Sequence, residues 1–253
     1  KFLSAPPMDV ALPWLAPGDP LPTPESAWGL DTPAPGLLAA GGTLDTETLC
    51  CAYAQGTFPW FSDGQPILWW APDPRMVLQV NQFKLHPSLR KTLKKFQKSP
   101  ECSVTIDKAF SRVIRTCATQ SRKGQNGTWI VPSMVEAYEQ LHALGVAHSV
   151  ETWVDDKLVG GLYFVALGKA VFGESMFAHV TDASKIALAA LVCIAKAQGV
   201  PWIDCQQNTR HLASLGAAEI PRKAFVADIQ ALSSEPDPQW FFESVYWSQL
   251  LSR

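Results

Sequence analysis

The spacing of apolar and polar positions changes along the chain. The first forty residues are rich in proline and glycine, predict no regular element, and are expected to cover a core as extended segments. Apolar side chains recur at helical spacing in residues 86–98, 132–145 and 182–199, which predicts three helices. Residues 148–154 alternate instead with a period of two, and after a turn at Asp155-Asp156 a second strand is expected over 158–167, with Gly168 turning into a third over 170–177. That segment predicts a three-stranded antiparallel meander.

Capping and turn residues predict several shorter elements. Asp45 is a candidate N-cap for a short helix that ends near Gly56, and Asp107 is a candidate N-cap for a helix that runs to about Ala118. Two aromatic clusters flank a Ser-Asp-Gly turn at 62–64 and predict a hairpin-like unit. A short buried strand at 200–205 and a short helix at 209–215 are expected after the 182–199 helix.

Strands, a strongly apolar helix and a further strand predict an α+β, or mixed α/β, fold. A proline-rich segment around Pro74 is the expected boundary between a small N-terminal domain, residues 1–74, and a larger domain, residues 75–253. A chain of 253 residues is long enough to bury a core of this size.

The composition of the chain limits the classes of function that it can have. Hydrophobic residues make up 47% and charged residues 17%, which is typical of a globular protein rather than a disordered one. The net charge of −2 means that nucleic-acid binding would need a local basic patch. None of the six cysteines forms a C-x-x-C pair or a zinc-like spacing, and no apolar run has the length of a membrane span. We therefore expect a reduced, cytoplasmic protein, most simply a monomer, with no metal or other cofactor.

A series of short motifs carries a resemblance to a known family. In order they are FPWF at 58–61, LWWAPDPR at 68–75, GTWI at 127–130, AHSVE at 147–151, LVGGLY at 158–163, GESMF at 173–177, DASK at 182–185, IDCQ at 203–206 and SLGA at 214–217. In this order and spacing they closely resemble the leucyl/phenylalanyl-tRNA–protein transferases over about residues 36–226. Phe164 departs from the family's usual glycine, and the aromatic tail after Ala231 finds no match.

The resemblance implies a fold and a reaction. The larger domain is expected to be like the GCN5-related N-acetyltransferases. The α-amine of a protein beginning with Arg or Lys attacks the ester of Leu-tRNA or Phe-tRNA, and in bacteria the product is marked for N-degron-dependent degradation. Whether Leu, Phe or Met is preferred stays open.

Three polar residues are the candidate catalytic groups. The reaction needs a near-neutral amine in line with a carbonyl, and a stabiliser for the oxyanion. Asp204 and Gln206 are two apart on a predicted strand, so they are expected to share a face, with Asp204 accepting from the Gln206 amide and orienting it. The tRNA ribose hydroxyl could relay the proton instead, and the pair could merely cap a loop. Glu174 lies among apolar residues and needs a partner, either the substrate amine or an internal cation.

The resemblance also assigns binding residues. It implies an apolar pocket for the transferred amino acid, formed by Leu162, Val171, Gly173, Met176, Leu191 and Ile203. Trp60 and Trp129 correspond to aromatics that meet the terminal adenosine of the tRNA, although either could be a core tryptophan. Lys91, Lys94, Lys95 and Lys98 are spaced along one helix face, which is either a solvated surface or a site for the tRNA acceptor stem.

Two other function classes compete. An N-acyltransferase that uses acyl-CoA should carry a Gly-rich pyrophosphate loop before a helix, and the sequence has none. A non-catalytic RNA-binding module would need only the aromatic and basic features. Ser175 is no nucleophile of the G-x-S-x-G kind, because Phe177 stands in the last glycine position. A Cys-His hydrolase built on Cys205 is the weakest alternative.

Overall fold

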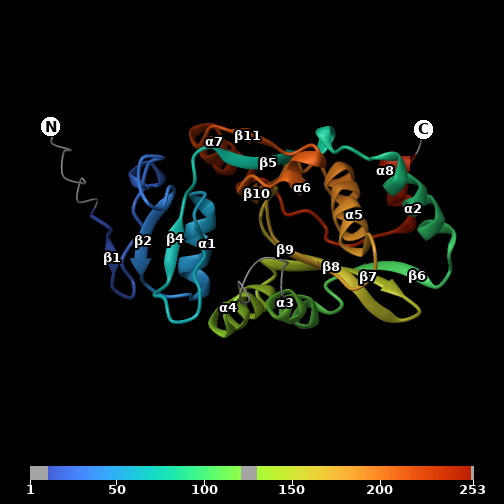
Figure 1. Ribbon diagram of the computed structural model, residues 1–253, viewed down its shortest axis with the longest axis horizontal. Helices are drawn as coiled ribbons and strands as arrows, with labels where there is room; N and C mark the ends of the chain where they lie inside the picture. Colours follow the sequence, from blue (N-terminus) through green and yellow to red (C-terminus); the bar gives the residue numbers. More distant parts are fainter. Residues whose placement is uncertain (1–10, 121–129, 252–253) are drawn as a thin grey trace, which may run out of the picture.

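A computed structural model describes residues 11–120 and 130–251. Two sheets form its frame, and helices cover them (Figure 1). The small sheet has the strand order β1-β2-β4-β3, with β1 (Trp14–Leu15), β2 (Leu37–Gly41), β3 (Phe58–Pro59) and β4 (Leu68–Trp70). The large sheet has the order β11-β5-β10-β9-β8-β7-β6, with β5 (Arg75–Gln79), β6 (Cys102–Ile106), β7 (Ala147–Val154), β8 (Lys157–Leu167), β9 (Ala170–Ala178), β10 (Trp202–Gln206) and β11 (Ala218–Ile220).

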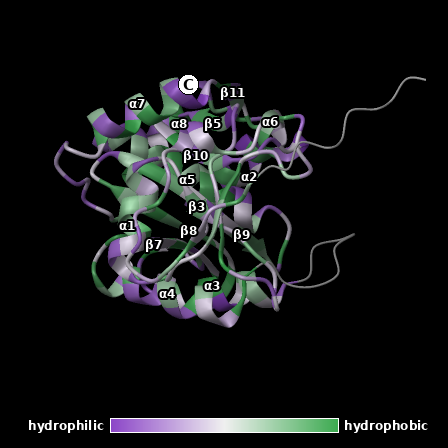
Figure 2. Cartoon of the chain, turned by 90° about the vertical axis from the view of Figure 1, so that its left-hand side faces the viewer, coloured by the Kyte–Doolittle hydropathy of each residue, from purple (hydrophilic) through white to green (hydrophobic). Residues whose placement is uncertain are grey.

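Helices cover both faces of the large sheet. On one face α5 packs against β7, β8 and β9, and on the other face α3 packs against the same three strands and α4 against β7. The helices are α1 (Thr46–Ala54), α2 (Pro87–Lys98), α3 (Phe110–Thr119), α4 (Pro132–Ala143), α5 (Ala183–Gln198), α6 (Arg210–Ser214), α7 (Arg222–Leu232) and α8 (Ser248–Leu251), with 3₁₀ turns at Pro24–Ser26, Val80–Gln82 and Ser244–Trp247. Apolar positions gather on the strands and on α5, whereas the outer positions of the covering helices are polar (Figure 2).

The mixed α/β class is confirmed, with a small N-terminal sheet and a larger sheet domain. The first strand of the large sheet begins at Arg75, and the division of the chain at residue 74 stays a prediction. Helix α1 joins the two parts, because it contacts β3 of the small sheet and also α4 and β8. This junction matters because the candidate site lies beside it.

Most predicted elements occur where the pattern placed them. Helix α2 begins at Pro87, α5 ends at Gly199 in a left-handed conformation, and β7, β8 and β9 form the antiparallel meander. Asp45 caps α1 by accepting from the Thr48 amide at 2.8 Å. Strand β10 then runs parallel to β9, with α5 as the crossover.

One helix start was predicted wrongly. Asp107 does not cap α3; it has a φ of 59° and its carboxylate binds the His148 ring at 2.7 Å and the Ser149 amide at 3.0 Å. The amide of Ala109, at the start of α3, donates to Glu151 instead, at 2.8 Å. The free backbone amide at the start of α3 is therefore satisfied by Glu151 of β7 and not by Asp107, the local residue that the sequence predicted.

The aromatic tail closes one end of the large domain. Trp240 packs against His148 and Phe164 of the sheet, with ring centroids 5.4 and 4.8 Å away. Trp247 is buried and lies edge-on to Phe96 of α2 at 6.2 Å. Phe164, the residue that departs from the family's usual glycine, is thus packed beneath the tail, away from the cleft described below.

Candidate active site

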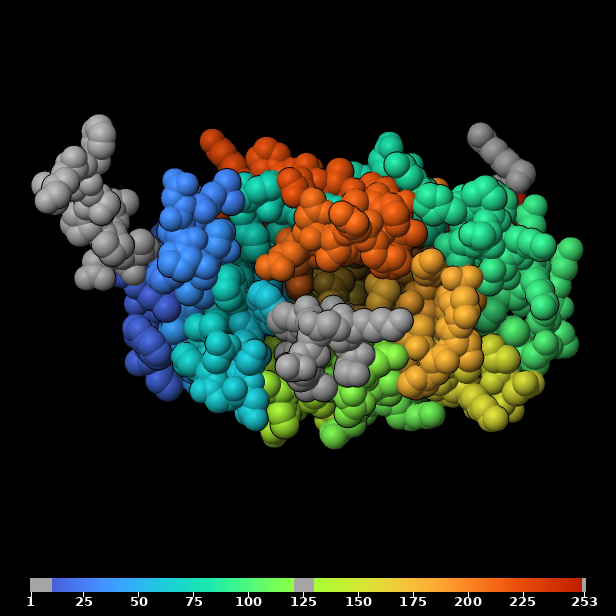
Figure 3. Space-filling model, in the orientation of Figure 1, coloured from blue at the N-terminus to red at the C-terminus, as the bar shows by residue number. Residues whose placement is uncertain are grey.

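A cleft opens where the two parts of the molecule meet. Its volume is about 700 Å³, and its described lining comes from β3, α4, β8, β9, α5, β10, α6 and the segments next to them. In Figure 3 the surface is hollowed at the centre of this face, beneath the orange residues of α6. A smaller apolar cavity of about 70 Å³ continues from the cleft between β8, β9, α5 and β10.

Glu174 of β9 lines both hollows and is the candidate proton acceptor. Its Oε1 accepts a hydrogen bond from the Gln206 side-chain amide at 3.2 Å, and another from the Tyr53 hydroxyl. No lysine or arginine of the described residues forms an ion pair with it, so the internal cation considered above is not its partner.

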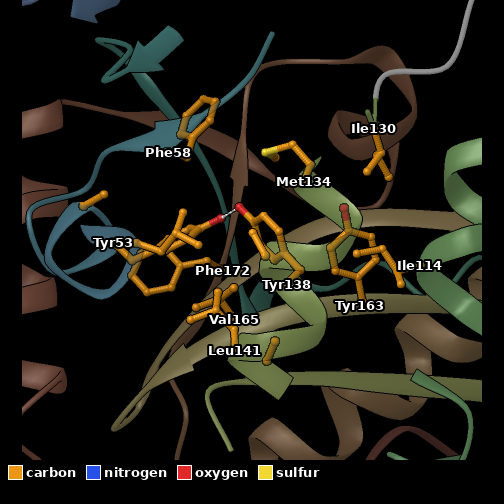
Figure 4. Close-up of a cluster of buried hydrophobic side chains, with 14 of the residues drawn as sticks. Tyr53, Phe58, Ile114, Ile130, Met134, Tyr138, Leu141, Tyr163, Val165 and Phe172 are labelled. Atoms are coloured by element: carbon orange, nitrogen blue, oxygen red, sulfur yellow. Dashed lines mark hydrogen bonds between the residues drawn. The ribbon is translucent and has the colours of Figure 1, made fainter. Parts of the chain in front are cut away.

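Two buried tyrosines support this carboxyl group. Tyr53 of α1 is hydrogen-bonded to it directly, and Tyr138 of α4 is hydrogen-bonded to Tyr53, so that the two hydroxyls point toward one another in Figure 4. Because the single hydroxyl hydrogen of Tyr53 is donated to Glu174 in a hydrogen bond, Tyr138 is the donor in the hydrogen bond between the two tyrosines. Removal from water and the nearby Glu174 charge raise the pKa of both phenols well above the usual value, so they stay protonated donors.

Burial sets the acidity of Glu174. Desolvation raises the pKa of its carboxyl group to about 8, and the charge of Asp204 adds to this rise. The hydrogen bonds from Tyr53 and Gln206 and the charge of Arg75 act in the opposite direction. The group is therefore poised to exchange a proton near neutral pH, which is the property that general acid–base catalysis requires.

Asp204 has a different role from the one predicted. Its carboxylate forms a bidentate ion pair with Arg75, at 2.7 and 2.9 Å, and both side chains are 0% exposed. It accepts from the backbone amide of Gln206 at 2.9 Å, and the Gln206 side-chain amide donates to Glu174. The prediction that Asp204 binds and orients the Gln206 side-chain amide is therefore wrong.

The reason lies in the backbone of β10. Gln206 has a φ of +66°, and the register of β10 against β5 shifts between Asp204 and Gln206. The alternation of side chains along a regular strand therefore stops at this point. Asp204 is directed into the core, whereas Gln206 is directed into the cleft.

Most of the predicted aminoacyl-pocket residues line the small cavity. They are Leu162, Gly173, Met176, Leu191 and Ile203, joined by Leu188 and Leu212. Val171 is different, because it is fully buried within the sheet, opposite Ile203 in register, and does not line the cavity. At Gly173 an added Cβ would lie 3.1 Å from the Asp204 carbonyl oxygen, so glycine lets β9 approach β10 closely beside the cavity.

The residues predicted to bind tRNA lie in different places. Trp60 lines the cleft, with its ring 5.4 Å from that of Trp70. Trp129 lies outside the described residues. The four lysines are exposed on α2 and are not part of the cleft lining, but α2 touches the start of α5 through a 3.5 Å contact between Thr92 and Asp182.

Sequence reasoning missed Arg75, Tyr53 and Tyr138. Each carried a usable signal, because an arginine at the head of an apolar strand and a tyrosine on the inner side of an apolar helix both need a polar partner. The signal does not identify that partner: for the tyrosines it depends on α1, α4 and β9 meeting in space, and for Arg75 on β5 pairing with β10.

Within residues 11–120 and 130–251 no three His, Cys, Asp or Glu side chains are grouped as metal ligands would be. In the same part of the chain, no helix combines the length and the apolar character that crossing a membrane requires.

Comparison with known proteins agrees with this geometry. The sequence model described as leucyl/phenylalanyl-tRNA protein transferase matches residues 77–230, and that of the N-terminal domain of the same family matches residues 42–73. Proteins named leucyl/phenylalanyl-tRNA–protein transferase are 63% identical in Polaromonas sp. (strain JS666 / ATCC BAA-500) and 59% identical in Albidiferax ferrireducens, over 95% of this chain and 94% and 95% of theirs. One from Burkholderia orbicola (strain MC0-3) is 54% identical, over 95% of each chain.

The class of protein is therefore an aminoacyltransferase. The chain belongs to the leucyl/phenylalanyl-tRNA protein transferase family, because the family's sequence model covers more than half of it and relatives match almost all of it. A solved structure described as L-PGS from Bacillus licheniformis aligns with a TM-score of 0.39 and 11% identity, over 70% of this chain and 57% of that one.

Proposed function

We propose that the protein transfers Leu or Phe, with Met as a further candidate, from aminoacyl-tRNA to the N-terminal α-amine of proteins that begin with Arg or Lys. One observation carries this proposal: an apolar cavity opens into a polar cleft beside a carboxyl group whose pKa is about 8. The product marks its protein for N-degron-dependent degradation. The enzyme acts in the cytoplasm as a monomer.

The chemistry suits this cleft. The amine nitrogen attacks the ester carbonyl carbon, a C–N bond forms, and the bond to the ribose oxygen breaks. The proton lost by the amine passes to Glu174 and then to the departing ribose oxygen. A free α-amine has a pKa of about 7.7–8.0, close to that of Glu174, so the transfer between them costs little.

No metal or nucleotide is needed in this proposal, because the ester donor is already activated and its conversion to an amide is downhill. The Gln206 amide donates to Glu174 and lies at the cleft, where it can also bond the amine or the developing oxyanion. Glu174 is the one carboxylate in the described lining of the cleft, and in its ionised form it favours an acceptor with added positive charge.

The terminal adenosine and the acceptor stem of the tRNA are assigned to different surfaces of the protein. Trp60 offers an aromatic face for the terminal adenosine, and stacking on an aromatic side chain contributes about 1–3 kcal/mol per base. Lys91, Lys94, Lys95 and Lys98 on α2 offer a basic surface for the acceptor stem.

The test of the function is direct transfer. Purified protein is mixed with labelled Leu-tRNA and peptides that begin with Arg, Lys, Asp or Ala. The expected result is labelling of the Arg and Lys peptides at the α-amine. Labelling of none of them contradicts the proposal, and equal labelling of all four contradicts the acceptor preference.

Met176 gives a prediction about the transferred amino acid. Met176→Ala enlarges the cavity without opening a fully buried core position. Leu loses contact with the missing side chain, whereas Phe can extend into the space. We expect the ratio of kcat/KM for Phe-tRNA to that for Leu-tRNA to rise by about fivefold, or about 1 kcal/mol. An unchanged ratio would show that Met176 is not part of the pocket wall.

The lysines of α2 give a prediction about salt. A double substitution, Lys94→Ala with Lys95→Ala, should reduce the slope of log affinity for charged tRNA against log salt by about 1–2, because fewer counterions are released. A matched control is Lys157→Ala with Lys223→Ala, which removes two exposed lysines from the start of β8 and from α7. Equal slopes for the two variants would mean that α2 does not face the tRNA.

A further inference from the structure

Arg75 connects the small N-terminal part of the molecule to the candidate active site. Its Nη1 donates to the carbonyl oxygen of Gly56, just after α1, at 2.7 Å. Its guanidinium lies over the rings of Phe58 and Phe225, at 4.9 and 4.5 Å from their centroids. Every side of this cation is therefore in contact with a fixed group, and it is fully buried.

The contacts continue from Arg75 toward the cleft. Nε and Nη2 hold both oxygens of Asp204, and Oδ1 of Asp204 holds the backbone N–H of Gln206. That N–H belongs to a residue in the left-handed region, which a non-glycine residue adopts at a cost. Asp204 is well placed to stabilise this conformation, because a carboxylate is a strong acceptor for a backbone amide.

The left-handed turn has a consequence for the cleft. A regular strand would place the Gln206 side chain on the same side as that of Asp204, which is inside the core. With a φ of +66° the Gln206 side chain instead lines the cleft, and its amide reaches Glu174 at 3.2 Å.

We propose that Arg75 is a positioning residue for acyl transfer: it fixes Asp204, and Asp204 fixes the left-handed turn that directs the Gln206 amide to Glu174. The inference rests on the proposed function. It differs from a purely structural ion pair in predicting an effect on the reaction itself. It also couples the end of α1 to the reaction, because Gly56 and Arg75 share a hydrogen bond.

The two charges of the pair act on Glu174 in opposite directions. Arg75 lowers the pKa of Glu174, whereas Asp204 raises it. Removing Arg75 alone should therefore move the pH midpoint of transfer upward, whereas removing both charges should leave it near the wild-type value. A structural ion pair with no link to the site would move neither midpoint.

The experiment uses the full chain and three variants. Arg75→Lys keeps the charge but loses the two-pronged contact, Arg75→Met loses both, and Arg75→Met with Asp204→Asn leaves no buried charge unpaired. The matched control is Arg222→Met, since Arg222 also donates from Nη1 to a carbonyl of the N-terminal part, that of Ala71 at 2.9 Å. Single-turnover transfer to an Arg-starting peptide is measured against pH, together with binding of charged tRNA and thermal unfolding.

We expect the single-turnover transfer rate of Arg75→Lys to be lower than that of wild type by a factor of about ten or more. Its affinity for charged tRNA should change by less than about twofold. Arg75→Met should raise the pH midpoint, and the double variant should restore the midpoint but not the rate. If Arg75→Met unfolds, the Lys variant and the uncharged double variant decide the question. Rates like that of Arg222→Met, with no shift of the midpoint, would overturn the inference. Absence of transfer by the wild-type protein would instead overturn the proposed function.

Discussion

Replacing Glu174 with glutamine is expected to slow single-turnover transfer by about 100-fold or more, or about 3 kcal/mol. Glutamine keeps the size of the side chain but takes up no proton from the amine. Wild-type transfer should rise with pH through about 8, the pKa that burial gives Glu174. The measurement is the rate of transfer to an Arg-starting peptide under saturating charged tRNA, as a function of pH.

The α-amine of the substrate titrates in the same pH range as Glu174. The pH–rate profile therefore has two limbs, one for the amine and one for Glu174, and they must be separated. Peptides whose α-amines differ in pKa move the amine limb and leave the Glu174 limb in place. In Glu174→Gln only the amine limb should remain. A glutamine variant with the wild-type rate and both limbs intact would exclude Glu174 as the proton acceptor.

Glu151 supplies a matched control. Burial also raises the pKa of this carboxyl group, but its partners are Ser149, Thr105 and the amide of Ala109, and it does not line the cleft. Glu151→Gln should therefore transfer at nearly the wild-type rate in the folded protein. A loss as large as that of Glu174→Gln would point to general damage rather than chemistry.

The raised pKa also predicts how stability depends on pH. The folded carboxyl of Glu174 binds its proton more tightly than the unfolded one, with a pKa of about 8 against 4.5. Its contribution to stability is therefore complete below the unfolded pKa and is lost as the pH rises through about 8. Relative to wild type, Glu174→Gln should gain about 2–4 kcal/mol in free energy of unfolding between about pH 5 and pH 9. Urea titrations at the two pH values measure the gain, and equal differences at both would contradict the raised pKa.

The sequence predicted the elements that depend on local spacing. Helix α5 has apolar residues around its full circumference and a glycine at its end, and β7, β8 and β9 are segments rich in apolar residues, separated by two short turns. Strand β5 and helix α7 went unrecognised. The five-residue strand Arg75–Gln79 holds only three consecutive apolar residues, too few to show a period, and its place in the sheet is set by pairing with the distant β10 and β11.

The candidate site likewise has a part that the sequence predicted and a part that it did not. The motifs placed Glu174, Gln206 and most cavity residues, and the structure brings these together around one cleft. The partners of Asp204 could not be derived, because they depend on a single backbone angle at Gln206 and on an arginine 129 positions away. Local rules assume a regular strand, and they fail where a site needs an irregular one.

Gln206 is the second residue whose loss should have a large effect. Gln206→Ala removes the amide that donates to Glu174 at 3.2 Å, and with it a donor available to the amine or the oxyanion. We expect kcat to fall by about 10–100-fold while tRNA binding changes little, because the contact matters most in the transition state. Gln198→Ala, which removes a glutamine at the far end of α5, is the control and should transfer normally.

The pH profile identifies which role Gln206 plays. Its hydrogen bond lowers the pKa of Glu174, so Gln206→Ala should move the Glu174 limb to higher pH. The double variant with Glu174→Gln should be little slower than Glu174→Gln alone, because the two side chains act as one unit. The four corners of this cycle are measured by single-turnover transfer to an Arg-starting peptide. Strictly additive losses with an unmoved limb would mean that Gln206 contacts the substrate independently of Glu174. A loss of less than about twofold would mean that Gln206 only shapes the cleft.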